Sequence, residues 1–355
     1  MEIQNSKFRI PNLITSQPVI GITMGDPAGI GPEIIIKALA DPNVRRAAKF
    51  VIFGMHEQLC YAADRAEVEP FWGRYQHEKI SRDYPYKVVV ADYDEYSVPP
   101  WIKRPSKTGG ESSVKFCLDA VDAARAGIID AVVTAPINKT SWKMAGVAWP
   151  GHTEMLADRC KSKRKVMMFV TERLKVALAT IHEALFEVRH KFTIGCIFEP
   201  IDLLNTALKE FFNISNPKIG VAALNPHAGE NGRFGDEEQR IISPAILLAQ
   251  EQGINCNGPF PADTLFIRAL NGEFDAVVAM YHDQGMIPVK LLAFEEAVNI
   301  TIGIPIIRTS PAHGTAFDIT GRNLANPAGM KSAINTSIQM IAAHKARQLT
   351  VAAEN

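Results

Sequence analysis

The chain has few cysteines, no excess of charge of either sign and no long apolar run, and each shortage excludes a class of protein. Its five cysteines are odd in number, widely spaced and without any CxxC pair, which argues against a disulfide framework and a zinc knuckle. Lysines plus arginines equal aspartates plus glutamates at 38 each. The long-range positive field of a nucleic-acid binder is therefore missing, and a small-molecule partner is favoured.

Targeting and membrane signals are also missing. Residues 1–17 are polar and lack the apolar core of a signal peptide, and no later run reaches the roughly 20 apolar residues that a membrane span needs. Together with the cysteine pattern, this predicts a cytoplasmic protein without membrane partners. At 355 residues the chain is long for one small core, so we expect two domains or one large α/β unit.

The sequence does contain a regular alternation of short apolar runs with segments of helical periodicity, which is typical of the α/β class. Residues 93–110, with a Pro-Pro and a Gly-Gly pair, are expected to form a long surface connection. Strands are predicted at residues 19–23, 49–54, 86–91, 130–135, 166–170, 176–180, 218–224, 276–280 and 299–303, and helices at 31–40, 112–126, 236–252 and 329–347.

The first predicted strand runs into a glycine-rich turn, residues 24–33, that precedes a predicted helix. Its glycine spacing matches neither GxGxxG nor the phosphate-binding loop that ends in Gly-Lys-Ser/Thr. Glycines punctuate turns far more often than they hold phosphate. We therefore interpret the segment as a tight strand-to-helix turn near a pocket.

Three histidines, His182, His227 and His282, stand directly after apolar, strand-like runs. In open α/β sheets the strand tips line the ligand crevice, so three imidazoles delivered there can converge on one divalent metal. A single histidine at such a position is usually a packing or hydrogen-bonding residue. The metal-site prediction therefore depends on all three histidines together. The nearby carboxylates Glu230 and Asp283 are candidates to orient the imidazoles or to ligate directly.

A second set of residues suits an anionic ligand. Lys290 stands between apolar neighbours, and Arg308 follows two isoleucines. Such embedded charges need a partner more often than surface charges do, and a bound phosphate supplies one. His152 and Thr153 can donate hydrogen bonds to the same oxygens, and Asn299 completes the set.

A third segment, residues 310–327, is rich in small residues, which let a flat ring approach the backbone. Asp318 and Asn326 within it can bond sugar hydroxyls or ring nitrogens. By composition alone the segment is no more than a loop.

Six short motifs are spread over nearly the whole chain from about Val19 onward: GDPAGIGPE (25–33), GHTE (151–154), NPHAGE (225–230), PADT (261–264), YHDQG (281–285) and HGTA (313–316). They appear in the order seen in the 4-hydroxythreonine-4-phosphate dehydrogenase family, which includes 4-phosphothreonate and 4-phosphoerythronate dehydrogenases. Agreement of six ordered motifs by chance is improbable. The chain is therefore identified as a member of this family.

The resemblance implies a fold of two α/β/α domains, of the isocitrate and isopropylmalate dehydrogenase type, with the active-site cleft between them. We accordingly expect an N-terminal extension at 1–18, one domain at 19–150 plus 305–355, and a second domain at 151–304. The segment from His313 to Pro327 is similar to the adenine-binding loop of those dehydrogenases, which lack the GxGxxG fingerprint. A homodimer is also implied, with metal sites that draw residues from both subunits.

The same resemblance implies roles for individual residues. Three imidazoles suit zinc, manganese or cobalt better than magnesium, and the choice between NAD and NADP stays open. The implied metal ligands are His182, His227 and His282; the implied substrate contacts are His152, Thr153, Lys290, Asn299 and Arg308; and the implied NAD contacts are His313, Gly314, Thr315, Ala316, Asp318 and Asn326.

The implied reaction is oxidation of 4-phosphohydroxy-L-threonine at its 3-hydroxyl by NAD, followed by decarboxylation to 3-amino-2-oxopropyl phosphate. A metal suits both steps because each develops negative charge on oxygen. The group that takes the hydroxyl proton is not decided by the sequence. Lys290, Asp263 and Asp283 are the candidates.

Other substrates and another class of protein remain as alternatives. Sugar-acid relatives oxidise 4-phosphothreonate or 4-phosphoerythronate to dihydroxyacetone phosphate, and residues 285–293 and Glu183 look somewhat more like those relatives. Relatives that act on unphosphorylated dihydrodiol dicarboxylates lose part of the phosphate-binding set, which is complete here. A non-catalytic metabolite-binding protein is expected to have a damaged ligand or cofactor set.

Overall fold

The structure, a computed structural model, describes residues 17–354, so the predicted extension at 1–18 lies almost entirely outside the described residues. One mixed sheet of twelve strands has the order β3-β4-β2-β1-β5-β12-β11-β6-β7-β10-β8-β9, which confirms the predicted α/β class. The strands are β1 (Val19–Thr23), β2 (Lys49–Gly54), β3 (Gly73–Gln76), β4 (Val88–Asp92), β5 (Ala131–Thr134), β6 (Val166–Val170), β7 (Lys175–Leu178), β8 (Ile219–Ala222), β9 (Cys256–Phe260), β10 (Ala276–Ala279), β11 (Val298–Ile302) and β12 (Ile307–Pro311).

Two blocks of parallel strands meet at an antiparallel junction in the middle of this sheet. Strands β3, β4, β2, β1, β5 and β12 are parallel to one another, and so are β7, β10, β8 and β9. Between the blocks, β11 runs antiparallel to both β12 and β6, and β6 runs antiparallel to β7. Central strands such as β1, β5 and β10 are buried along their whole length, as expected for parallel strands covered on both faces.

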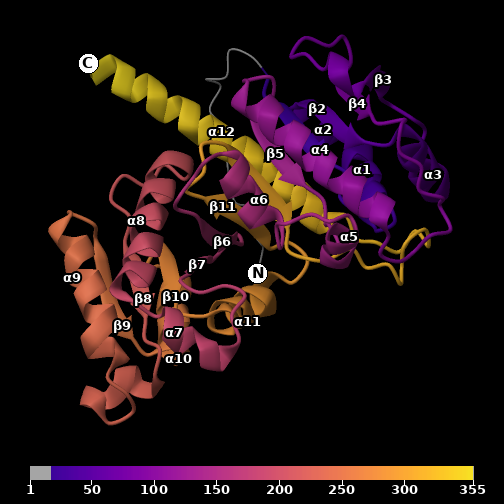
Figure 1. The fold of residues 1–355 in the computed structure, drawn as a ribbon. Helices are drawn as coiled ribbons and strands as arrows, with labels where there is room; N and C mark the ends of the chain where they lie inside the picture. Colours follow the sequence, from indigo (N-terminus) through magenta and orange to yellow (C-terminus); the bar gives the residue numbers. More distant parts are fainter. Residues whose placement is uncertain (1–16, 355) are drawn as a thin grey trace, which may run out of the picture.

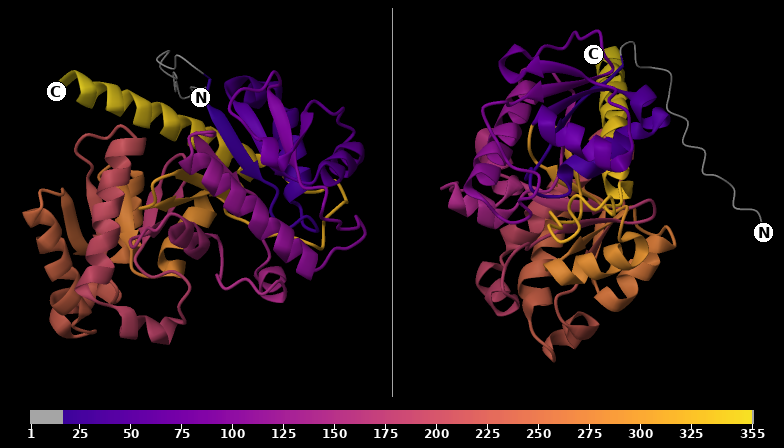
Figure 2. Two further views of the ribbon diagram at one scale, coloured as in Figure 1. Left: turned by 45° about the horizontal axis from the view of Figure 1, so that its top comes forward. Right: turned by 90° about the vertical axis from the view of Figure 1, so that its right-hand side faces the viewer.

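Helices cover both blocks, which form two lobes (Figures 1 and 2). The long C-terminal helix α12 packs on β12 and also contacts α8 of the other lobe. The helices are α1 (Gly31–Ala40), α2 (Pro42–Ala47), α3 (His56–Ala66), α4 (Lys107–Arg125), α5 (Lys139–Met144), α6 (His152–Arg159), α7 (Val188–Lys191), α8 (Ile194–Phe211), α9 (Ser243–Glu251), α10 (Ala262–Leu270), α11 (His282–Ala293) and α12 (Ala328–Glu354), with short turns η1 (His77–Lys79), η2 (Leu185–Glu187), η3 (Pro226–Gly232) and η4 (Glu238–Ile242).

Three strands are not predicted by the sequence pattern, and each has a physical reason. Strand β3 is a polar edge strand, and β9 contains a Gly-Pro pair that is unusual inside a strand. Strand β12 places a charged residue, Arg308, at a buried position, where an apolar side chain is the rule. The predicted bounds of β1, β2, β6 and α1 agree with the structure.

The prediction of a long surface connection at 93–110 is wrong at both ends. Tyr93 is fully buried, and its hydroxyl donates to Asp119 at 2.8 Å. Helix α4 already begins at Lys107, because the side chain of Ser106 accepts a hydrogen bond from the Gly109 amide and caps the helix. The Gly-Gly pair therefore belongs to the first turn of a helix.

The predicted division into residues 19–150 plus 305–355 and residues 151–304 stays a prediction, because the sheet continues through β12 and β11 from one lobe to the other. Within residues 17–354, the structure shows no helix with the length and apolar composition of a membrane span.

Candidate active site

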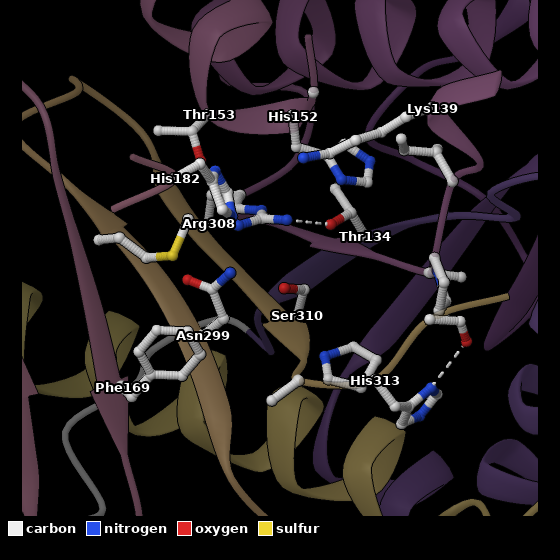
Figure 3. Close-up of a pocket in the computed structure, with 18 of the residues that line it drawn as sticks. Thr134, Lys139, His152, Thr153, Phe169, His182, Asn299, Arg308, Ser310 and His313 are labelled. Atoms are coloured by element: carbon white, nitrogen blue, oxygen red, sulfur yellow. Dashed lines mark hydrogen bonds between the residues drawn. The ribbon is translucent and has the colours of Figure 1, made fainter. Parts of the chain in front are cut away.

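A cleft of about 280 Å³ lies over one face of the sheet at the antiparallel junction. Side chains alternate between faces along a strand, so Arg308 of β12, Asn299 of β11 and Phe169 of β6 all point into it (Figure 3). The end of β5, the start of α6 and part of α11 form the remaining walls. The cleft brings together nine of the predicted site residues: His152, Thr153, His182, His282, Lys290, Asn299, Arg308, His313 and Gly314.

Arg308 is the charged group at the base of this cleft, and its side chain is almost fully buried. Its Nη2 donates to Thr134 Oγ1 at 2.6 Å and its Nη1 to Thr301 Oγ1 at 3.2 Å, while Nε has no partner among the described residues. No carboxylate of the described part of the chain forms an ion pair with it, and burial lowers the pKa of Arg308 to about 10. A buried guanidinium without a counter-ion is costly unless an anion binds there.

Three further polar atoms in the cleft are buried and have no partner among residues 17–354: His152 Nε2, Asn299 Oδ1 and His313 Nε2. Burial and the charge of Arg308 hold the pKa of His152 well below its usual range, so this imidazole is neutral. Buried polar groups are nearly always hydrogen-bonded in native proteins. Four orphan atoms in one cleft, counting Arg308 Nε, therefore indicate a polar ligand.

The glycine-rich turn after β1 supports the wall of the cleft, which confirms the predicted strand-to-helix turn. The Asp26 amide donates to the carbonyl of Pro136, a residue of the cleft wall, at 3.0 Å. Gly25 has φ +73°, and a Cβ there would lie 2.2 Å from the same carbonyl oxygen. The buried Asp26 carboxyl accepts from Ser141 Oγ at 2.6 Å, and burial raises the pKa of Asp26.

Two of the three predicted metal-binding histidines lie side by side at the mouth of the cleft. The ring centroids of His182 and His282 are 6.2 Å apart. His282 Nδ1 lies 2.7 Å from Asp283 Oδ1, which fixes the proton on Nδ1 and leaves Nε2 as a ligand atom. Burial, with a smaller effect of the Lys139 ammonium, lowers the pKa of His182. Two imidazoles at the edge of one cavity can supply two of the ligands of a divalent metal ion.

The third histidine, His227, is exposed on η3 and contacts Phe234 instead, at 6.3 Å between ring centroids. In one chain, no three His, Cys, Asp or Glu side chains of the described residues are placed to hold a metal ion. A three-histidine site therefore requires a second copy of the chain, as the family resemblance implies, and it stays a prediction.

The backbone around His227 is strained. Five consecutive residues, 227–231, have φ between +43° and +77°, and only one of them is glycine. A left-handed conformation costs roughly 1–2 kcal/mol for each residue with a Cβ. Such strain persists only where the surroundings fix it, and it concentrates at functional sites.

The buried carboxylate of Glu238 fixes the entry to this strained turn. Its Oε1 accepts from the amides of Leu224 and Asn225 at 2.9 and 2.7 Å, and its Oε2 accepts from Asn225 Nδ2 at 3.1 Å. Gly229 packs so closely that a Cβ would lie 2.7 Å from Glu238 Oε2. Glu238 is not among the residues predicted from the sequence, where it is one of many glutamates on a helix.

We expect Glu238→Ala to destabilise the protein by about 2–4 kcal/mol, because it leaves buried N–H groups without their charged acceptor. The free energy of unfolding in urea measures this. Glu237→Ala is the matched control, because the Glu237 carboxylate contacts only Asn225 Nδ2 in this turn, and it should cost less than about 1 kcal/mol. Equal effects of the two substitutions would show that Glu238 has no special role.

Only the first part of the loop that resembles an adenine-binding loop reaches the cleft. His313 and Gly314 line it, and burial lowers the pKa of His313. Thr315 is buried beneath the glycine-rich turn, where its carbonyl accepts from the Ile30 amide at 3.0 Å. Ala316 is partly buried with φ +41°, whereas Asp318 and Asn326 are exposed. The NAD contacts stay a prediction.

Helix α1 holds the far end of this loop. Lys37 Nζ donates to the carbonyls of Asn323 and Ala325, both at 3.0 Å. Glu33 Oε1 accepts from Lys37 Nζ and from the Ala325 amide, both at 2.8 Å. The loop is therefore fixed in place by an ion pair of the helix that follows the glycine-rich turn.

The three candidates for the proton acceptor occupy different places. Lys290 lines the cleft from α11. Asp283 faces a neighbouring cavity behind the histidine pair. Asp263 is exposed on α10 and lines neither cavity, so Lys290 is the best placed of the three.

Thr134, Lys139 and Ser310 also line the cleft but are not predicted from the sequence. Each stands near a strand or helix end without a distinctive motif. Lys139 follows a predicted strand at a distance of a few residues, and that position is the one signal that points to it.

The fold is that of an α/β protein, and its cleft combines a buried cation with a pair of imidazoles. The profile of the family described as "Pyridoxal phosphate biosynthetic protein PdxA" matches residues 46–337. The chain belongs to this family, which confirms the family predicted from the six motifs.

Named relatives agree with this assignment. A 4-hydroxythreonine-4-phosphate dehydrogenase from Desulforapulum autotrophicum is 44% identical over 327 residues, which cover 90% of this chain and 94% of the relative. A D-threonate 4-phosphate dehydrogenase from Salmonella typhimurium is 40% identical over 324 residues, with 90% and 98% covered. The crystal structure of a 4-hydroxythreonine-4-phosphate dehydrogenase from Klebsiella pneumoniae is 37% identical, has a TM-score of 0.82, and matches 92% of this chain and 100% of its own. The relatives are dehydrogenases of phosphorylated hydroxy acids, as expected.

Proposed function

We propose that this protein oxidises 4-phosphohydroxy-L-threonine at its 3-hydroxyl with NAD and decarboxylates the product to 3-amino-2-oxopropyl phosphate, as a cytoplasmic homodimer. The observation that carries the proposal is Arg308, a buried guanidinium that faces the cleft without a counter-ion. A phosphate group supplies that charge and accepts from the free N–H of Arg308. The family and the names of the relatives point to the same kind of substrate.

Some residues of the cleft bind the substrate, and others take part in the reaction. Arg308 binds the phosphate, and this anchor fixes where the hydroxyl at the next carbon lies. Met167, Phe169 and Met286 give the cleft an apolar wall, which limits water and strengthens the electrostatic contacts inside. When bound, a divalent metal at the histidine pair would supply Lewis-acid stabilisation of charge on oxygen, and NAD would supply a hydride acceptor. Lys290 is the group we assign to hold and move the hydroxyl proton.

The homodimer is supported by apolar side chains exposed on the segments that follow His182 and His282 along the chain. Phe186 of η2 and Leu291 of α11 are 87% and 82% exposed, and Phe294, which follows α11, is 70% exposed. Exposed apolar patches of this kind mark protein interfaces. A second copy covering this surface accounts for the patch and can bring its own His227 to the pair.

A second substrate class has its own support. The relative from Salmonella typhimurium is named for D-threonate 4-phosphate, in which a hydroxyl replaces the amine at the second carbon. The proposed contacts of the cleft are with the phosphate, and they do not distinguish an amine from a hydroxyl at the second carbon. We therefore include 4-phosphothreonate and 4-phosphoerythronate as alternative substrates, with dihydroxyacetone phosphate as the product.

NADH absorbance with a panel of acids tests the proposal. With Mn²⁺ or Zn²⁺ present, we expect turnover of at least one phosphorylated acid of the panel. The same acid without its phosphate should show a kcat/KM at least about a hundredfold lower, because the charged contacts to Arg308 are lost. No absorbance change with any phosphorylated acid, with either metal, would contradict the proposed function.

A further inference from the structure

The three histidine-bearing segments of one chain leave neighbouring strands at the same edge of the sheet. Strand β10 lies between β7 and β8 (Figure 1), and His182 follows β7, His282 follows β10 and His227 follows β8. The three strands are parallel, so their carboxyl ends lie together. The contacts that hold these strand ends therefore determine where the three histidines lie.

The two sides of β10 differ at this edge. Toward β7, pairing continues past the strand, because the amide and the Oγ1 of Thr180 donate to the Met280 carbonyl at 3.2 and 2.8 Å. Toward β8, the last paired residues are Val278 and Val221. Beyond them, no backbone hydrogen bond joins the two segments in the part of the chain that the structure describes. The ends of β10 and β8 thus separate, whereas those of β10 and β7 stay together.

The side chain of Gln284 spans the gap between β10 and β8. Its Oε1 accepts from the Met280 amide at 2.7 Å, and its Nε2 donates to the Ala223 carbonyl at 2.8 Å. Met280 and Ala223 are almost fully buried, so their backbone groups need these partners. A carboxamide carries a donor and an acceptor, as a peptide group does. Gln284 therefore replaces the backbone pair that is missing between the two strand ends.

On the β8 side, this contact fixes the entry to the strained turn that carries His227. Gln284 holds the Ala223 carbonyl, and the carboxylate of Glu238 holds the two amides that follow. The segment before the turn is therefore fixed from both sides by side chains of other elements.

We propose that Gln284 is a positioning residue that sets His282 against the turn that carries His227. On the β10 side, Met280 stands two residues before His282, and Gln284 itself stands two residues after it, in the first turn of α11. The inference rests on the proposed function, in which His227 completes the metal site of the opposite subunit. Gln284 then links the two metal sites of the dimer, because its two hydrogen bonds support ligands of different sites.

Metal affinity and stability measured on the same variant test this inference. Gln284→Leu removes both hydrogen bonds. We expect it to raise the Kd for Mn²⁺, measured by calorimetry, about tenfold, which is typical for the loss of a group that orients metal ligands. The Kd of the metal-free protein for inorganic phosphate should change less than about twofold, because Arg308 lies on β12, outside the linked strands. Unchanged phosphate binding also shows that the variant is folded.

Gln250→Leu is the matched control. Gln250 Nε2 also donates to the backbone carbonyl of a strand residue, Cys256 of β9, at 2.8 Å, but none of the three histidines follows that strand. This variant should unfold at a lower urea concentration than the parent protein and keep the parent's Kd for Mn²⁺. If Gln284→Leu does not fold, Gln284→Asn replaces it, because its shorter carboxamide cannot reach both backbone groups.

Mixed dimers test the link between the two sites. In a dimer of one His182→Ala chain and one His227→Ala chain, the single complete site takes His227 from the first chain and the histidine pair from the second. Gln284→Leu should raise the Kd of this site for Mn²⁺ about tenfold whichever of the two chains carries it, because each chain supplies one side of the link. An effect from one chain alone would overturn the link.

The failure of this inference and the failure of the proposed function give different results. A Gln284 variant that keeps the parent's Kd for Mn²⁺, however much its stability falls, would overturn the positioning role and leave the proposed function intact. If the unaltered protein binds neither Mn²⁺ nor Zn²⁺, the metal-dependent function fails, and the positioning role fails with it.

Discussion

Arg308→Met is expected to lower kcat/KM for the phosphorylated substrate about a thousandfold, mainly through a rise in KM. The guanidinium is buried and without a counter-ion among the described residues, so we expect the phosphate of the substrate to be the partner for its charge. Losing charge-assisted contacts in a buried site costs about 2–5 kcal/mol, and a factor of ten in affinity corresponds to about 1.4 kcal/mol. Steady-state kinetics with saturating NAD measures the effect, and the KM for NAD should change little.

The same substitution has an opposite effect on the unliganded protein. Burial lowers the pKa of Arg308 from its ordinary 12.5 to about 10, so the charged form is destabilised by about 3 kcal/mol. Because the folded-state pKa lies below the unfolded value, this penalty is fully present below about pH 10. Methionine removes the penalty, while the hydroxyls of Thr134 and Thr301 lose a donor. We expect the unliganded variant to be at least as stable as the parent.

Thermal unfolding with and without phosphate separates the two effects. The parent protein should unfold at a higher temperature when phosphate is added, because the ligand binds only the folded state. The Arg308→Met variant should show no such rise. A variant that is strongly destabilised without phosphate, or still stabilised by it, would remove Arg308 from the anion site.

Strand periodicity explains how much of this site could be predicted from the sequence. Strands such as β1 and β6 are apolar at every position, and runs of that kind reveal buried strands. Residues that follow such runs, including His182 and His282, can be recognised as residues of strand ends. Arg308 could be predicted as an anion-binding residue because a charged residue directly after two isoleucines needs a partner for its charge.

Other parts of the site depend on contacts between residues far apart in the sequence, which local sequence patterns do not predict. Whether Asn299 and Arg308 share a face depends on the register of β11 against β12, which follows from the whole sheet. The place of Asp318 depends on how α1 holds the segment 313–327, nearly 300 residues away in sequence. Glu238 acts through the backbone amides of Leu224 and Asn225, which its residue type does not indicate. None of these could be read from residue type and spacing.

Mixing two inactive variants should restore about one quarter of the activity of the parent protein, if His227 completes the metal site of the opposite subunit. His182→Ala and His227→Ala should each abolish turnover and bound metal. When subunits are mixed at random, about half of the dimers contain one chain of each variant, and one of the two sites in such a dimer has all three histidines. Activity and metal content measured after refolding the two variants together test this.

Mixing His182→Ala with His282→Ala is the matched control. The structure places both of these histidines on one chain, with ring centroids 6.2 Å apart, so in a mixed dimer each site still lacks one of them. No activity should return, although the number of mutated residues is the same as in the first mixture. Recovery in the control, or none in the first mixture, would show that His227 does not serve the partner's site. Full activity of the His227→Ala dimer by itself would remove His227 from the metal site altogether, because a ligand that contributes to a divalent ion cannot be lost without weakening its binding.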